Sequence, residues 1–304
     1  MQLEQAYEKL LFSPRWYHLP FIALMLPLSL IYGCVMWTRR VVSTKKDFGI
    51  PIVSVGNLIV GGSGKTPFTI ALASGLDNVA IISRGYGRRS RGLVEVSHQG
   101  KIVASVEQSG DEPMLMAHSL PKASVIVSED RHQAIRLAKE KGAKLIILDD
   151  GFNRVEIKKF EIILEPGTIK NHLPFPAGPF REFWFTKKYA DIVAKEGRDF
   201  RREVALENPR SKMVLVTAIA HPQRLDRYLP KDVIEKVYLR DHDYFDEGKI
   251  RELMDACGAD SILCTSKDRV KMEGFDLPIS ELKLKLNIEN DIIKEIQSYI
   301  QSSL

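Results

Sequence analysis

The stretch "IPIVSVGNLIVGGSGKT", residues 50–66, decides the fold. It opens with an apolar run that predicts a buried strand over Ile50–Val55, and it ends in a glycine-rich turn that leads into Lys65 and Thr66. In a P-loop, backbone N–H groups wrap nucleotide phosphates at a helix N-terminus, while the lysine reaches the β- and γ-phosphates and the hydroxyl holds Mg²⁺. The stretch departs from G-x-x-x-x-G-K-[ST] only at Ile59, which stands where the first glycine belongs.

The surroundings of this turn favour a nucleotide site. A strand precedes it, and a helix is expected over Thr66–Leu76, as a P-loop requires. The alternative is a glycine-rich turn that ends in Lys-Thr by chance. We therefore predict that the ATP phosphates bind at Gly61, Gly62, Ser63, Gly64, Lys65 and Thr66.

Two carboxylates follow a second apolar strand in "LIILDDG", residues 145–151. Turns favour Asp, so an apolar strand that ends in Asp is by itself weak evidence. Combined with a P-loop, the pair indicates a magnesium site. We predict that Thr66, Asp149 and Asp150 hold Mg²⁺.

Short apolar runs alternate with helical patterns from Ile50 onward, which is typical of a parallel sheet covered on both faces. An exception is Leu93–Ala104, where "HQGK" separates two alternating segments and predicts an inserted hairpin. The proline-rich segment 172–183 predicts an irregular loop. The expected strands are Ile50–Val55, Val79–Ser83, Ser124–Val127, Leu145–Leu148 and Phe160–Leu164, and the expected helices are Thr66–Leu76, Asp111–His118 and Glu129–Lys141.

A second set of strands and helices follows a charged patch at Arg198–Glu207. We predict an α/β protein with a P-loop NTPase-like parallel sheet core over residues 46–208, a smaller α/β lobe over 209–304 and an N-terminal membrane-associating segment over 1–45. In the second lobe the expected strands are Met213–Ala218, Val237–Leu239, Ser261–Cys264 and "LKLKLNI", and the expected helices are Pro222–Tyr228, Asp246–Cys257 and Glu289–Gln301.

The N-terminus contains 19 consecutive uncharged residues, Leu19–Trp37. A straight helix of this length spans roughly 28 Å, the lower limit for crossing the hydrocarbon core of a bilayer. Pro20, Pro27 and Gly33 favour a bent helix in one leaflet at least as much as a full span, and a buried hairpin helix is the alternative. Basic residues follow the run, which predicts that the rest of the chain stays on the cytoplasmic side. They are Arg39, Arg40, Lys45 and Lys46.

The composition limits the function classes. The chain has 304 residues, 44% of them hydrophobic, which is enough for a real core and excludes a disordered or fibrous protein. Its three cysteines form no C-x-x-C pair, so a reducing compartment without a zinc site is expected. The net charge is a mild +5, and the basic residues are not interleaved with aromatics on a recognisable module. The sequence therefore predicts no nucleic-acid partner, and it indicates no protein partner.

Eight motifs together resemble the tetraacyldisaccharide 4′-kinases of lipid A biosynthesis, a family of membrane-associated P-loop kinases. They run in the order of the family across nearly the whole chain, after an apolar N-terminal helix. The P-loop of the family also lacks the first glycine. The motifs are "SVGNLIVGGSGKTP" (54–67), "SRGYG" (83–87), "GDEP" (110–113), "DDGF" (149–152), "LPFPAGPFRE" (173–182), "AIAHPQR" (218–224), "DHDYF" (241–245) and "TSKDRVK" (265–271).

This resemblance implies transfer of the ATP γ-phosphate to the 4′-hydroxyl of an acylated disaccharide lipid, tetraacyldisaccharide 1-phosphate, to give lipid IVA. It implies Mg²⁺-ATP as cofactor and a location on the cytoplasmic face of the inner membrane, at the inner-leaflet surface. It also suggests Asp111 as proton acceptor, with His242 in support and Lys65 on the phosphates; the alternatives are a helix N-cap and a loop histidine. We assign the substrate side to Ser83, Arg84, Tyr86, Arg131, Arg181 and Glu182, with surface salt bridges as the alternative for the arginines.

The sequence departs from the family where Asn153 and Arg154 replace the usual Gln-His pair, and where Arg88 replaces a glycine. Two other functions also fit a P-loop. One is a partitioning or carrier-type ATPase that dimerises on membranes, and the other is a membrane-attached nucleotide-binding scaffold without turnover. The first leaves "GDEP" and "DHDYF" without a role, and the second leaves the full set of Lys65, Thr66 and the two aspartates unexplained.

Overall fold

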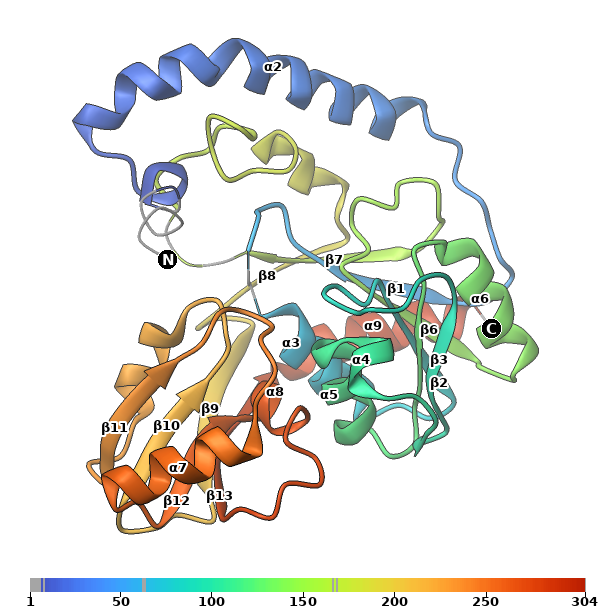
Figure 1. The fold of residues 1–304 in the computed structure, drawn as a ribbon. Coiled ribbons are helices and arrows are strands. Elements are labelled where there is room, and N and C mark those ends of the chain that lie inside the picture. The colour runs from blue at the N-terminus through green and yellow to red at the C-terminus, as the bar shows by residue number, and fades with distance from the viewer. Residues whose placement is uncertain (1–6, 8, 62–63, 166, 168, 304) are drawn as a thin grey trace. The chain divides into compact units, whose positions relative to one another are not determined.

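The chain folds as a mixed α/β protein in which most strands are parallel (Figure 1). The computed structural model describes residues 7, 9–61, 64–165, 167 and 169–303. Two compact units divide the chain. The first comprises Met1–Thr69, Lys144–Arg201 and Ile288–Leu304, and the second comprises Ile70–Ala143 and Arg202–Asn287.

The sheet of the first unit carries the P-loop strand. Its strands follow the order β6-β1-β7-β8, and all neighbours are parallel. Because Val55 on β1 lies opposite Asp149 on β6, the P-loop and the two aspartates leave the sheet at the same edge. The strands are β1 (Ile52–Gly56), β6 (Leu145–Asp149), β7 (Phe160–Glu165) and β8 (Ile192–Lys195).

Two further helices take part in this unit. Helix α3 (Lys65–Ala73) begins at the end of the P-loop, as the motif predicts. Helix α9 (Asn290–Ser303) brings Tyr299 to the start of β1, where its hydroxyl donates to the carbonyl of Ile52 at 3.2 Å. The ring of Tyr299 also packs on Phe160, with 4.9 Å between the ring centroids. The C-terminal segment is therefore part of the packing around β1.

Helix α2 (Leu19–Val42) is one continuous helix of 24 residues with Pro27 inside it. Its length of about 36 Å exceeds the roughly 30 Å of a bilayer core. Together with the short helix η1 (Trp16–His18), it forms a segment long and apolar enough to cross a membrane. Only Ile22, Ser29 and Gly33 are buried. The prolines do not interrupt the helix, and its exposure argues against the buried hairpin considered above.

One face of α2 packs on the proline-rich loop that precedes helix η2 (Trp184–Tyr189) (Figure 1). The hydroxyl of Ser29 donates to the carbonyl of Pro174 at 2.6 Å. A Cβ added to Gly33 would lie 2.7 Å from the ring of Phe183, so the helix approaches the loop more closely than a larger residue allows. The predicted irregular loop is thus the surface on which the apolar helix rests.

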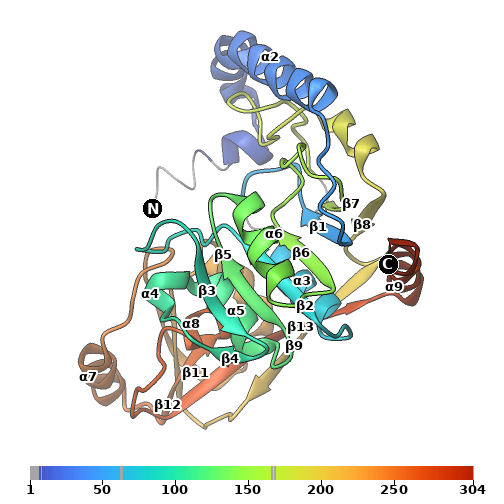
Figure 2. The ribbon, with the colours of Figure 1, turned by 90° about the vertical axis from the view of Figure 1, so that its right-hand side faces the viewer.

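In the second unit, four strands are neighbours in the order β4-β3-β5-β2 (Figure 2). Strands β2 and β5 are parallel, whereas β3 pairs antiparallel with both β5 and β4, which confirms the inserted hairpin. The elements are β2 (Val79–Ser83), β3 (Val94–His98), β4 (Lys101–Ile102), α4 (Val106–Ser109), α5 (Asp111–Ser119), β5 (Ser124–Val127) and α6 (Arg131–Glu140).

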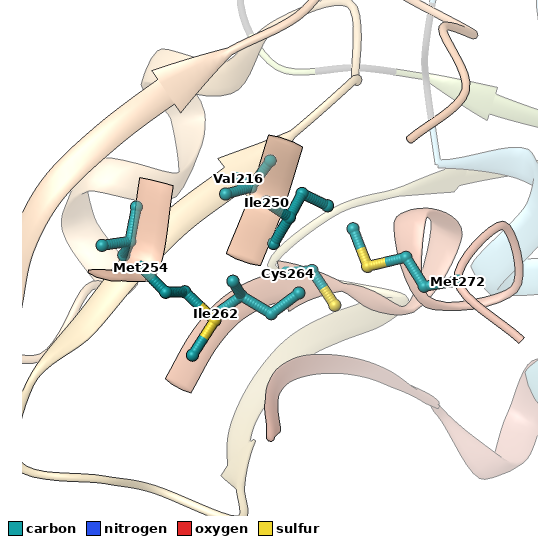
Figure 3. Close-up of a cluster of buried hydrophobic side chains, with 7 residues drawn as sticks. Val216, Ile250, Met254, Ile262, Cys264 and Met272 are labelled. Atoms are coloured by element: carbon teal, nitrogen blue, oxygen red, sulfur yellow. The ribbon is translucent and has the colours of Figure 1, made fainter. Parts of the chain in front are cut away.

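The same unit contains a second sheet in the order β11-β10-β12-β13-β9. Its strands β10 and β12 are parallel and almost fully buried, and α7 packs its Ile250 and Met254 against them (Figure 3). Met272, just after α8, fills the same cluster. The elements are β9 (Phe200–Glu207), β10 (Met213–Thr217), η3 (Pro222–Tyr228), β11 (Val233–Tyr238), α7 (Glu247–Cys257), β12 (Ser261–Thr265), α8 (Ser266–Arg269) and β13 (Ile279–Ile288).

Several elements differ from the sequence-based expectation, among them β11, which spans Val233–Tyr238 and not Val237–Leu239. The charged patch at Arg198–Glu207 contains the whole of strand β9, in which buried or partly buried positions alternate with exposed ones. Charged residues occur on both sides of the strand, with Arg201 and Glu203 exposed and Arg202 and Glu207 partly buried, and they hide the period of two from a search for apolar runs. Strand β8 is only four residues long and was not predicted, and Pro222–Tyr228 is a 3₁₀-helix.

Candidate active site

The P-loop joins the carboxyl end of β1 to α3. Gly61 and Gly64 both adopt positive φ angles, +91° and +84°, which L side chains rarely tolerate, so the two glycines are required by the backbone. The ammonium of Lys65 lies 3.3 Å from the side-chain oxygen of Asn57. Thr66 is in the first turn of α3 and is buried. The predicted phosphate residues Gly62 and Ser63 lie outside the described residues.

Ile59 occupies a position where this loop needs an apolar side chain. It is buried and packs with Phe152, Ile163 and Phe180. It also forms an isolated bridge with Phe180, and the neighbouring Val60 N–H donates to the carbonyl of Pro179 at 2.9 Å. A glycine here would leave a gap in this cluster. The departure from the P-loop pattern therefore serves the packing of the loop on segment 173–182.

The "DDGF" loop after β6 holds two carboxylates in different environments. Asp149 is buried at the end of the strand. Asp150 has φ of +52° and accepts from the guanidinium of Arg181 at 2.9 and 3.1 Å, and it lies 3.6 Å from the ammonium of Lys65. Gly151 must be glycine, because an added Cβ would lie 2.6 Å from the hydroxyl oxygen of Ser54. The predicted residues Lys65, Asp150 and Arg181 thus meet at one point.

The donor set at this edge fits Mg²⁺ by its chemistry. Thr66 offers a hydroxyl and Asp149 a carboxylate, the hard oxygen ligands that Mg²⁺ prefers. Within the described ranges, no group of three or more His, Cys, Asp or Glu side chains forms a complete protein cage. Asp150 is the less suitable of the two aspartates, because Arg181 and Lys65 already neutralise it.

Glu182, placed on the substrate side from the sequence, is bound to helix α2. It accepts two hydrogen bonds from the guanidinium of Arg40, at 2.7 and 2.8 Å, and both side chains are almost fully buried. Arg40 also donates to the carbonyl of Phe152 at 2.9 Å and stacks on its ring at 4.0 Å. This arrangement ties the end of α2 to the "DDGF" loop.

In the second unit, Asp111 and His242 form the predicted pair although 131 positions separate them. His242 Nδ1 lies 2.9 Å from Oδ2 and 3.1 Å from Oδ1 of Asp111. Asp111 is the first residue of α5, and its carboxylate also accepts the N–H of Glu112 at 2.9 Å. Gly110, rather than Asp111, is the N-cap.

Two lysines of the "TSKDRVK" segment face the same carboxylate. Lys267 Nζ lies 3.5 Å and Lys271 Nζ 3.8 Å from Oδ2 of Asp111. Burial would raise the pKa of Asp111, but the hydrogen bond with His242 and the charges of Lys267, His242 and Lys271 outweigh it, so this pKa lies below its ordinary value. The hydrogen bond to Asp111 raises the pKa of His242 despite partial burial. The pair therefore favours a carboxylate and a protonated imidazole.

The other predicted substrate residues lie near this pair or support it. Tyr86 is exposed, with its ring centroid 5.4 Å from that of His242, and Arg84 is also exposed. Ser83 ends β2, and its carbonyl accepts from Arg131 at 2.9 Å. Arg131 is buried and also donates to the carbonyl of Ser128. Its guanidinium therefore joins the ends of β2 and β5.

Four residues of these arrangements had no role assigned from the sequence: Arg40, Asn57, Lys267 and Lys271. Arg40 belonged to a basic group that predicts membrane orientation, and nothing in the sequence distinguishes it from Arg39. The "TSKDRVK" motif marked its lysines as part of the resemblance, but only the fold brings α8 next to α5.

Comparisons with known proteins agree with this geometry. A family model described as tetraacyldisaccharide-1-P 4′-kinase matches residues 21–301. A tetraacyldisaccharide 4′-kinase of Helicobacter acinonychis is 44% identical over 97% of this chain and 95% of the relative. That of Campylobacter jejuni serotype O:2 is 39% identical over 95% and 94%.

A solved structure has a similar fold. The crystal structure of LpxK from Aquifex aeolicus in complex with ATP superposes with a TM-score of 0.78 at 29% identity, over 92% of this chain and 99% of that one. The family match includes every candidate site residue. The chain belongs to the tetraacyldisaccharide-1-P 4′-kinase family.

Proposed function

We propose that the chain is an ATP-dependent lipid kinase. It transfers the γ-phosphate of ATP to the 4′-hydroxyl of a tetraacyldisaccharide 1-phosphate and forms lipid IVA. The observation that carries the proposal is the family match over residues 21–301, which includes the P-loop and the Asp111–His242 pair. The ATP complex of the Aquifex aeolicus relative supports ATP as the phosphate donor.

The P-loop would bind the triphosphate through its backbone N–H groups and Lys65. The contacts of Lys65 support this role, because Asn57 and Asp150 hold its ammonium beside the loop. Arg181 adds a second cation at the same place. Phosphoryl transfer requires mainly alignment and charge neutralisation, and this cluster is suited to supply both.

Thr66 and Asp149 would hold Mg²⁺, with Asp150 oriented by Arg181. When bound, Mg²⁺ would neutralise charge on the β- and γ-phosphates. In this proposal Glu182 orients the "DDGF" loop through Arg40 and does not bind the metal itself, since its two carboxylate oxygens are occupied by the guanidinium.

Asp111 would accept the proton of the 4′-hydroxyl. The hydroxyl oxygen attacks the γ-phosphorus, the bond to the bridging β–γ oxygen breaks, and ADP leaves with that oxygen. The lowered pKa of Asp111 keeps this carboxylate ionised before the reaction. His242 orients the carboxylate through Nδ1. Tyr86, which is exposed beside His242, and Arg84, which is also exposed, would contact the sugar or its phosphate.

Helix α2 would attach the enzyme to the cytoplasmic face of the inner membrane. Its support is the row of apolar side chains exposed to solvent, among them Leu24, Ile31 and Val35. Arg39, Lys45 and Lys46 are exposed beyond it and suit an anionic leaflet. The acyl chains of the substrate could then remain in the bilayer, since moving them into water costs about 0.8 kcal/mol per CH₂.

Incubation with γ-labelled ATP and tetraacyldisaccharide 1-phosphate tests the proposal. Thin-layer chromatography should show label in a more polar lipid, and Lys65→Ala should abolish this product. The Asp111→Ala variant should bind ATP normally but transfer less than about 1% of the wild-type label, in line with the 10²–10⁴-fold contribution of a general base.

The three candidate functions give different outcomes. A lipid kinase labels the lipid, a partitioning-type ATPase releases labelled inorganic phosphate without a lipid product, and a scaffold binds ATP without turnover. Near-normal transfer by purified Asp111→Ala would remove this residue from the proton-transfer role while leaving the kinase assignment intact.

A further inference from the structure

We propose that Asp268 and Lys271 of the "TSKDRVK" segment are positioning residues that hold His242 against Asp111. The inference rests on the proposed function, because it concerns the pair that would accept the hydroxyl proton. It adds two buried residues to the surroundings of that pair.

The backbone of His242 needs support from outside its own turn. Its φ of +65° is in the left-handed region, which a non-glycine residue occupies at a cost of order 1 kcal/mol or more. The surrounding turn is closed by Asp243 N–H, which donates to the carbonyl of Arg240 at 3.0 Å. A conformation of this kind persists only where neighbouring contacts fix it.

Asp268 fixes the residue that binds the backbone of His242. The N–H of His242 donates to the carbonyl of Ala218 at 3.2 Å. The N–H of Ala218 in turn donates to Asp268 Oδ1 at 3.0 Å, and the hydroxyl of Thr217 donates to Oδ2 at 2.6 Å. Asp268 is fully buried, so these bonds are shielded from water.

Lys271 fixes the backbone on the other side of His242. Its ammonium donates to the carbonyl of Asp243 at 3.0 Å and lies 3.6 Å from Asp268 Oδ1. The same ammonium lies 3.8 Å from Asp111 Oδ2 and 5.0 Å from the ring centroid of Phe245. The buried ammonium of Lys271 thus lies close to three groups: the turn that contains His242, the carboxylate of Asp268, and the carboxylate of Asp111.

The hydrophobic core of the second sheet fixes this pair in place. Met272 follows Lys271 directly and packs with Cys264 and Ile250 (Figure 3). At the start of α8, Thr265 donates its hydroxyl to Asp268 Oδ2 at 2.7 Å. Core packing on one side and a helix cap on the other leave the pair little freedom to move.

Lys267 gives an internal comparison. It lies 3.5 Å from the same oxygen of Asp111, but its other neighbours are Glu112 at 3.7 Å and Asp241 at 3.5 Å, and its side chain is partly exposed. It therefore contributes charge, whereas Lys271 contributes both charge and a hydrogen bond to the main chain. The two lysines should have different effects on kcat and on its pH dependence.

The test compares Lys271→Met with Lys267→Met in the full-length enzyme. We expect Lys271→Met to lower kcat by about 10²-fold, the effect of misplacing a reacting group by about 1 Å, with KM for ATP unchanged. Lys271→Arg keeps the charge and should recover part of kcat. Lys267→Met removes a cation from Asp111 without removing a hydrogen bond to the main chain, so it should lower kcat less than Lys271→Met does. Lys236→Met, which removes an exposed ion pair with Asp226, is the matched control that should leave kcat unchanged.

The pH profile separates positioning from a loss of stability. Removing either lysine removes a cation from Asp111, so the pKa of Asp111 rises and the acid limb of kcat moves to higher pH. Lys271→Met should also lower the plateau, and more than Lys267→Met does. The charged and titratable groups around Asp111 are His242, Lys267, Lys271, Glu112, Asp241 and Tyr244.

Two measurements keep the test decisive if Lys271→Met folds poorly. Thr217→Val removes one donor to Asp268 without exposing a charge, and it should lower kcat severalfold with unchanged KM. Imidazole nitrogen NMR of Thr217→Val should show that the hydrogen bond from the Nδ1 proton of His242 to Asp111 is weakened, and this readout does not depend on turnover or on the folding of Lys271→Met.

A folded Lys271→Met enzyme with wild-type kcat, acid limb and His242 spectrum would overturn the inference. If the wild type itself labels no lipid, the proposed function fails, whereas the NMR comparison still decides whether Lys271 positions His242.

Discussion

The contact between His242 and Asp111 links the stability of the second unit to pH. The pKa of Asp111 is lowered, so its stabilising contribution is present above its unfolded value of about 3.9 and disappears as pH falls through the folded pKa. The pKa of His242 is raised, so its contribution is complete below about 6.5 and disappears as pH rises through the folded pKa. Both contributions are present between these limits.

We therefore expect Asp111→Asn to lower the free energy of unfolding more at pH 5.5 than at pH 9. Urea titrations of the wild type and the variant at both pH values measure the difference. Asp226→Asn removes a carboxylate from an exposed pair with Lys236 and should show no comparable pH dependence. An equal loss at both pH values for Asp111→Asn would mean that the imidazole does not carry the coupling.

Gly151 gives a second prediction at the scale of one residue. A Cβ there would lie 2.6 Å from Ser54 Oγ and 2.7 Å from Leu148 Cβ, inside a buried strand end. We expect Gly151→Ala to destabilise the protein by about 1–3 kcal/mol, the usual cost of overpacking. Gly75→Ala is the control, because its Cβ would meet nothing within 4 Å. Thermal denaturation compares them, and equal stability would show that β1 and the "DDGF" loop adapt.

At the scale of elements, α2 is held at its end by one arginine of an adjacent pair. Arg40 forms a buried bidentate contact with Glu182, whereas Arg39 pairs with Glu156 at 3.4 Å on the surface. Removing one partner of a buried pair leaves an uncompensated charge, at a typical cost of 3–5 kcal/mol, whereas exposed pairs contribute about 0–1 kcal/mol.

Arg40→Met should therefore destabilise the first unit strongly and Arg39→Met hardly at all. Arg40→Lys should not restore the lost stability, because lysine cannot form the bidentate contact with Glu182 or stack on Phe152 in the same way. Denaturant titrations provide the comparison, and the double variant with Glu182→Gln should recover part of the loss. Equal effects at positions 39 and 40 would contradict the anchoring role of Arg40.

The elements also show how far the sequence could predict this molecule. Buried parallel strands such as β2 and β5 were found at their observed bounds, because continuous apolar runs between turn residues have few other interpretations. Strand β9 was missed because its exposed side is charged, and β8 because it is very short. The motifs pointed to the P-loop and to the Asp111–His242 pair. Arg40 and Lys271 could not be found in this way, because they contact residues that are remote in the sequence and that only the fold brings together.

At the scale of the whole molecule, the exposed apolar surface of α2 predicts attachment to lipid. Leu24 and Ile31 are 69% and 62% exposed, and a soluble protein rarely presents so many large apolar side chains along one helix. The three-part division into residues 1–45, 46–208 and 209–304 stays a prediction, whereas the contacts define two units that each draw on separate stretches of chain.

We expect the purified protein to sediment with phosphatidylglycerol-containing vesicles. The double variant Leu24→Glu/Ile31→Glu should lose at least about 50-fold in partitioning, since one charge at the centre of the bilayer already costs about 2.5 kcal/mol by insertion scales. Ile234→Glu changes an exposed apolar residue of β11 and serves as control. Binding that is lost equally with Ile234→Glu, or retained by the double variant, would rule out α2 as the attachment site.

The small number of buried positions on α2 has a consequence for how this helix can evolve. At Ile22, Ser29 and Gly33 a change must satisfy the loop beneath, and Gly33 has no room for even one methyl group beside Phe183 unless that ring moves. Arg40 is constrained in the same way by its contact with Glu182. At the exposed apolar positions of the helix, selection acts on hydrophobicity alone, so leucine, isoleucine, valine and phenylalanine can exchange by neutral drift. A saturation library grown under selection for viability should therefore tolerate few substitutions along a narrow stripe, whose positions are seven and four residues apart. The exposed apolar positions of the helix should accept most hydrophobic substitutions.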